Sequence, residues 1–184
     1  MEEKHLMGER FGASVRKGGG LGDGFGVRGR WEVVCRDKDG NIKWTDHIDN
    51  LVTNAGLDYL LDVGLSAGTQ VTSWFVGLTS GTPTPSAADT LASHAGWTEV
   101  TDYTGNRKAW TDGGVSNQSV SNSGSAAVFE IDGAVTIGGA FLASAATGTT
   151  GTLYAVGAFS GGNKTLGSGD SLSVTATFTA AAAS

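Results

Sequence analysis

The stretch Asn50–Thr79 reads NLVTNAGLDYLLDVGLSAGTQVTSWFVGLT, and it decides the fold because a helix signal and a strand signal lie side by side in it. Its second half contains Trp74–Leu78, whose aromatic and β-branched side chains are typical of a strand. The chain after this stretch has the pattern of short strands, whereas the chain before it has the pattern of an arm. The stretch therefore marks the beginning of a β-rich body.

The first half of the same stretch predicts a helix over about residues 54–63. Thr53 or Asn54 can cap its start, because a short side-chain oxygen accepts a backbone N–H of the first turn. Leu57, Leu60 and Leu61 then recur at the spacing of one helix face. Gly64 is expected to end the helix, because glycine adopts a left-handed conformation without steric cost.

Short apolar segments follow, separated by clusters of glycine, asparagine and serine. The strand candidates are residues 97–103, 108–111, 116–121, 126–131, 135–143, 152–159 and 172–179. Strands at this spacing predict an antiparallel β-sandwich or jelly roll. Residues 135–143 and 152–159 are apolar on both faces, which favours central positions in a sheet.

A β-hairpin is predicted over residues 30–48. In its first strand Trp31, Val33 and Cys35 alternate with more polar residues, so they are expected to face the core. The segment Asp37–Asn41 supplies the turn, where Gly40 can adopt a positive φ. The domain organisation predicted from the sequence is an arm at residues 1–29 and a β-sandwich domain at residues 30–184.

The predicted arm is rich in glycine between residues 17 and 26, which disfavours a helix or strand of its own. Residues 10–36 contain six basic and two acidic residues, whereas residues 50–184 contain three basic and nine acidic ones. A basic arm on an acidic body is expected to contact a partner. The candidate partner-binding residues are Arg10, Phe11, Arg16, Lys17, Leu21, Phe25, Arg28 and Arg30.

Charge and hydropathy argue against several classes of function. Because the body is acidic, it would repel phosphates, so no nucleic-acid partner is expected. The sequence contains no long apolar run and no secretory signal, so we expect synthesis in the cytoplasm and no membrane partner. The single cysteine, Cys35, excludes an internal disulfide and is expected to be buried and reduced.

No motif predicts an enzyme, a cofactor or a metal site. The glycine run beginning at Lys17 lacks the strand and helix that flank a phosphate loop, and Asp37–Asn41 lacks the distal glutamate of a calcium loop. His5, His47 and His94 are scattered, with no pair at i and i+4. The five tryptophans are expected mostly at core or interface positions, the alternative being an exposed carbohydrate platform.

Several segments resemble one family. They are NLVTNAGLDYLLDV at residues 50–63, WFVGLT at 74–79, AADT at 87–90, HAGWTEVTDYTGNR at 94–107, IGGAFLAS at 137–144 and GDSLSVTATFTA at 169–180. Together they resemble a group of tailed-bacteriophage virion proteins, whose nearest understood relatives are capsid decoration, or cement, proteins. The resemblance covers most of residues 30–180 and offers no catalytic residue.

The resemblance implies a structural virion protein that binds the head exterior in many copies and clamps neighbouring capsid subunits. The implied partners are the major capsid protein and other copies of the chain, as a dimer or trimer. Alternative functions are a neck or tail adaptor, which would suit the long arm, and a tail-associated carbohydrate- or receptor-binding module. The implied location is the outside of the virion head.

Because the sequence contains no cluster of metal ligands, we expect stability that does not depend on divalent cations. The melting temperature of the protein measured with and without EDTA should be the same. A fall of many degrees in the chelator would show that a structural metal is present.

Overall fold

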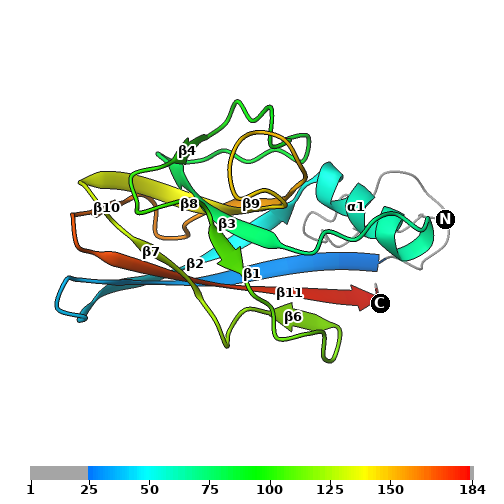
Figure 1. The fold of residues 1–184 in the computed structure, drawn as a ribbon, viewed down its shortest axis with the longest axis horizontal. Coiled ribbons are helices and arrows are strands. Elements are labelled where there is room, and N and C mark those ends of the chain that lie inside the picture. Colours follow the sequence, from blue (N-terminus) through cyan, green and yellow to red (C-terminus); the bar gives the residue numbers. More distant parts are fainter. Residues whose placement is uncertain (1–24, 183–184) are drawn as a thin grey trace, which may run out of the picture.

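The computed structural model describes residues 25–182, which form a mainly β fold with one helix (Figure 1). The elements are β1 Phe25–Arg36, β2 Ile42–Val52, α1 Asn54–Leu65, β3 Trp74–Ser80, β4 Thr98–Val100, β5 Lys108–Trp110, β6 Ser119–Ser121, β7 Ala127–Glu130, β8 Val135–Ala143, β9 Leu153–Ala158, β10 Lys164–Leu166 and β11 Ser171–Ala182. The prediction of a mainly β protein with one short helix is confirmed.

The strands form a sheet in the order β4-β3-β8-β9-β2-β1-β11-β6, with β5 on β3, β10 on β8 and β7 on β11, and every strand pair is antiparallel. β2 connects the two halves, because its Ile42–Asn50 part pairs with β1 and its last two residues pair with β9. Figure 1 shows β1, β2 and β11 in one layer and β8 and β9 in the other. The sheet thus folds over on itself like a sandwich.

The core fills the space between these two layers. Trp31, Val33 and Cys35 of β1 are fully buried, as their alternation predicts. They share one apolar cluster with Val174 of β11 and Ile137 of β8. Because strand side chains alternate between faces, the outward residues of β1 remain available for solvent.

The predicted boundary between arm and domain is wrong, because β1 begins at Phe25 rather than at residue 30. Residues 25–29 pair with β11, so Arg28 and Arg30 are strand residues rather than arm residues. Glycine here does not break the strand. At Gly29 it leaves room for the side chain of Asn50, whose Oδ1 would lie 1.8 Å from an added Cβ. Arg10, Phe11, Arg16, Lys17 and Leu21 lie outside the described residues.

The helix begins as predicted and ends later than predicted. The Thr53 hydroxyl caps α1 by accepting the N–H of Gly56 at 3.1 Å. Gly64, expected to end the helix, lies inside it. The helix ends at its C-cap residue Ser66, whose N–H donates to the Asp62 carbonyl. The residue with a positive φ, 57°, is Ala67. A residue other than glycine supplies the left-handed turn.

Two of the predicted strands are much shorter in the structure, and one further strand was not predicted. Residues 97–103 contain only the short β4, and residues 116–121 contain only β6. A turn with positive φ at Asn117 and Gln118 precedes β6, which explains the shortening. β10 was not predicted, because Lys164–Leu166 is too short to show a period.

Two buried carboxylates attach β2 to the loops around β10. Asp170 accepts a hydrogen bond from the Gly167 N–H at 2.8 Å and forms an ion pair with Lys43 at 2.6 Å. Burial raises the pKa of Asp170, but these hydrogen bonds outweigh it and hold the pKa below its ordinary value. Asp46 makes the corresponding ion pair with Lys164 at 3.1 Å. The charged form of Asp170 therefore contributes to folding stability.

We expect Asp170→Asn to lower the free energy of unfolding by about 1–3 kcal/mol at neutral pH, because Lys43 and the Gly167 N–H then lose a charged acceptor. A group whose pKa is depressed in the folded state stabilises above its unfolded pKa, and this contribution is lost as pH falls. The difference from wild type should therefore shrink below pH ~4. Urea titrations at several pH values measure it. Asp49→Asn is the matched control, because Asp49 is 74% exposed.

Burial raises the pKa of the Cys35 thiol to about 11, and the nearby Asp170 carboxylate adds to this effect. Because the thiolate is the reactive form, we expect labelling of the native protein by a disulfide reagent at pH 7.5 to be at least ~100-fold slower than labelling in guanidinium. Equal rates would contradict the buried position of Cys35.

Candidate functional site

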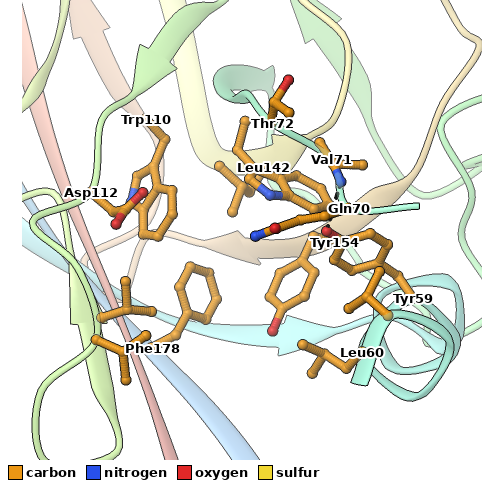
Figure 2. Close-up of a pocket in the computed structure, with 14 residues that line it drawn as sticks. Tyr59, Leu60, Gln70, Val71, Thr72, Trp110, Asp112, Leu142, Tyr154 and Phe178 are labelled. Atoms are coloured by element: carbon orange, nitrogen blue, oxygen red, sulfur yellow. Dashed lines mark hydrogen bonds between the residues drawn. The ribbon is translucent and has the colours of Figure 1, made fainter. Parts of the chain in front are cut away.

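A pocket of about 490 Å³ lies between α1, the following segment and the ends of β3, β5, β9 and β11 (Figure 2). Its aromatic lining is Tyr59, Trp74, Trp110, Tyr154 and Phe178. Its other lining residues are Leu60, Val63, Gln70, Val71, Thr72, Asp112, Val115, Val120 and Leu142. These residues come from five separate parts of the sequence, so only the fold brings them together.

Close packing of α1 on β9 builds one wall of the pocket. Gly56 of α1 lies directly against the backbone of β9, where an added Cβ would be 2.3 Å from the Tyr154 carbonyl oxygen. Thr53 fixes this contact, because its N–H donates to the Tyr154 carbonyl at 3.0 Å and its hydroxyl donates to the Leu153 carbonyl at 2.5 Å. Tyr59, one turn along the helix, is thereby held at the pocket.

The aromatic rings of the pocket form a continuous series of edge contacts. Tyr59 meets Trp74 at a centroid distance of 5.1 Å, Trp74 meets Tyr154 at 5.4 Å, and Tyr154 meets Phe178 at 5.1 Å. Phe178 also meets Trp110 at 6.0 Å. Edge-to-face contacts of this kind add stability beyond area burial, so the pocket wall is preorganised.

Two of the polar atoms in this wall have protein partners, and a third has none among residues 25–182. The Val71 N–H donates to the Tyr59 hydroxyl at 3.0 Å, and Trp110 Nε1 donates to the Ala176 carbonyl at 3.2 Å. No hydrogen bond joins the Tyr154 hydroxyl to the described part of the chain, although Tyr154 is only 8% exposed. In Figure 2 its ring lies between Phe178 and Leu60.

The protonation state of Tyr154 suits hydrogen-bond donation. Burial, and to a smaller extent the neighbouring Tyr59, raises the pKa of Tyr154 to about 12. The hydroxyl therefore keeps its proton at neutral pH and can donate it. At the exposed side of the pocket, Asp112 accepts the Gly114 N–H at 2.8 Å through one oxygen. The pocket thus combines aromatic rings with polar groups that include the Tyr154 hydroxyl and the Asp112 carboxylate.

The opposite side of α1 carries a row of exposed leucines, which we call the leucine ridge. Leu57, Leu61 and Leu65 follow one another at i, i+4 and i+8 and are 40%, 56% and 84% exposed. Asp58 and Asp62 lie in the same turns and are also exposed, and α1 contains no basic residue. The sequence places Leu57 and Leu61 on one face, but it does not show that this face is left open.

Of the candidate partner-binding residues, only Phe25, Arg28 and Arg30 lie in the described part of the chain, and all three belong to β1. Among those described, Arg30 lies on the outer face of β1 and pairs with Asp49 at 3.6 Å between exposed side chains. His94 stacks on Trp97 at 3.7 Å. Within residues 25–182 no three histidine, cysteine or acidic side chains are grouped to hold a metal ion. No helix in the same range has the length and apolarity needed to span a membrane.

The tryptophans are mainly in the core, as predicted. Trp31, Trp97 and Trp110 are buried, and Trp44 and Trp74 are partly buried. What the sequence did not predict is that Trp74 and Trp110 are register partners of β3 and β5 beside a pocket. A pairing between strands that lie far apart in the chain leaves no local signal.

A comparison with models of protein families found no match, and a comparison with curated proteins also found none.

Proposed function

We propose that this chain is a structural virion protein of a tailed bacteriophage, which decorates the head exterior and clamps neighbouring capsid subunits. The leucine ridge is the observation that carries the proposal. Leu65 is 84% exposed on an ordered helix, and Leu57 and Leu61 extend the same apolar surface. Burying a leucine side chain stabilises a complex by roughly 1.5–3 kcal/mol, so a partner that covers this row gains affinity.

The charges beside the leucine ridge define the chemistry of the partner. Asp58 and Asp62 lie next to it, and no lysine or arginine occurs in α1. A complementary surface is therefore an apolar groove edged by basic side chains, and a second α1 would bring like charges together. We propose that the major capsid protein supplies this groove.

Decoration acts physically rather than chemically in this proposal. A protein that binds only the assembled shell stabilises that shell by mass action. Many copies, or a dimer or trimer that bridges symmetry-related sites, add avidity without a new kind of contact. Basic residues near the N-terminus, such as Arg10, Arg16 and Lys17, provide further contacts with an acidic neighbour in this proposal.

A second candidate is a receptor-binding module on the tail, which the aromatic pocket favours. Trp74 and Tyr59 are partly exposed at its wall, where a ligand can reach them. The leucine ridge would serve equally in a neck or tail adaptor. Localising the protein on intact particles by electron microscopy separates the head from the neck and tail.

The test of decoration uses shells of the phage that encodes the protein, assembled without it. Replacing Leu61 and Leu65 together by glutamine should weaken co-sedimentation with these shells by tenfold or more, equivalent to ~1.4 kcal/mol. Unfolding of the variant should remain close to wild type, because both side chains are exposed. Val128→Gln on β7 is the control, since Val128 is 42% exposed and lies away from α1.

Two results would count against the proposal in different ways. Wild-type protein that fails to bind the shells removes the decoration function. Wild-type binding that the double variant leaves unchanged removes the leucine ridge as the contact surface.

A further inference from the structure

We propose that the aromatic pocket beside α1 binds a neutral saccharide, with the Tyr154 hydroxyl and the Asp112 carboxylate as its principal hydrogen-bonding groups. This inference deepens the second candidate function above and rests on that function, but it does not depend on the leucine ridge or on capsid binding. It is carried by the pocket lining and by the Tyr154 hydroxyl, which has no hydrogen-bond partner among residues 25–182.

The aromatic lining suits one face of a sugar ring. A pyranose has C–H bonds on its apolar faces, and these pack against aromatic rings such as Trp74 and Tyr59. Both rings are held in place by edge contacts, so little ordering is needed when a ligand binds. The cavity of about 490 Å³ falls within the size range of small-ligand sites and admits a short oligosaccharide.

The polar lining suits the hydroxyl groups of a sugar. Tyr154 donates, because its pKa of about 12 keeps it protonated at neutral pH. Asp112 has one oxygen bonded to Gly114 N–H and its other oxygen available at the exposed rim, where it can accept from a sugar hydroxyl. Gln70 and Thr72 add groups that donate and accept.

Other ligand classes fit the same lining less well. A purely apolar ligand, such as an acyl chain, would cover the Tyr154 hydroxyl without offering it a hydrogen-bond partner, and this costs free energy. An anionic ligand would face the carboxylate of Asp112, and no lysine or arginine within residues 25–182 lines the pocket. A neutral ligand with many hydroxyl groups satisfies both constraints.

The experiment uses the full-length protein and four neutral disaccharides: maltose, cellobiose, lactose and N,N′-diacetylchitobiose. Saturation-transfer NMR and tryptophan fluorescence should detect binding of at least one of them, with a Kd on the order of a millimolar. Tyr154→Phe keeps the ring but removes the hydroxyl, and Asp112→Asn keeps an acceptor for Gly114 but removes the charge. Each should raise the Kd at least about fivefold.

Matched controls separate a lost contact from lost folding. Asp58→Asn removes an exposed carboxylate of α1 that does not line the pocket, and it should leave the Kd unchanged. Thermal melts of all variants should agree with wild type within a few degrees. A variant that lacks residues 1–24 should bind the sugars as the full chain does.

Three outcomes would overturn the proposal. The first is that none of the four sugars binds. The second is that a sugar binds equally well to wild type, Tyr154→Phe and Asp112→Asn. The third is that sugars bind only after removal of residues 1–24. This result would mean that the chain's own N-terminal segment, rather than a sugar, is the ligand of the pocket. None of these outcomes bears on shell binding, which the ridge variants test separately.

Discussion

The change of partner within β2 is the constraint on which the rest of the structure depends. β2 leaves β1 after Asn50 and joins β9 through Leu51 and Val52, so one strand belongs to both layers. β9 can approach this point closely because residue 157 is glycine: an added Cβ would lie 2.2 Å from Ile48 and 3.0 Å from the Asn50 Cα. A larger residue would push the layers apart and open the core.

The same change of partner determines where α1 lies and why a pocket exists beside it. β2 ends on β9 with its backbone bonded to that strand, and Thr53 continues this contact into the helix cap. α1 therefore starts against β9 and covers one end of the sandwich (Figure 1). Its inward residues line the pocket together with aromatic side chains from β3, β5, β9 and β11.

Local patterns in the sequence predict the elements well, but they predict little of the site. The alternation around Trp31 and the cap at Thr53 arise from neighbours in the chain, and both predictions are confirmed. The arm boundary fails because β1 is extended by pairing with β11, which lies at the other end of the sequence. The pocket likewise depends on the register of Trp74 with Trp110, which no local period encodes.

The two faces of α1 differ in what they can bind, and this follows from helix geometry. Leu57, Leu61 and Leu65 point away from the sandwich, whereas Tyr59, Leu60 and Val63 line the pocket. The leucine ridge offers exposed apolar surface beside carboxylates, which suits a protein partner with basic residues. The pocket offers ring faces and the Tyr154 hydroxyl, which suits a small polar ligand. Because the two sets of side chains do not overlap, substitutions in one set can be made without changing the other.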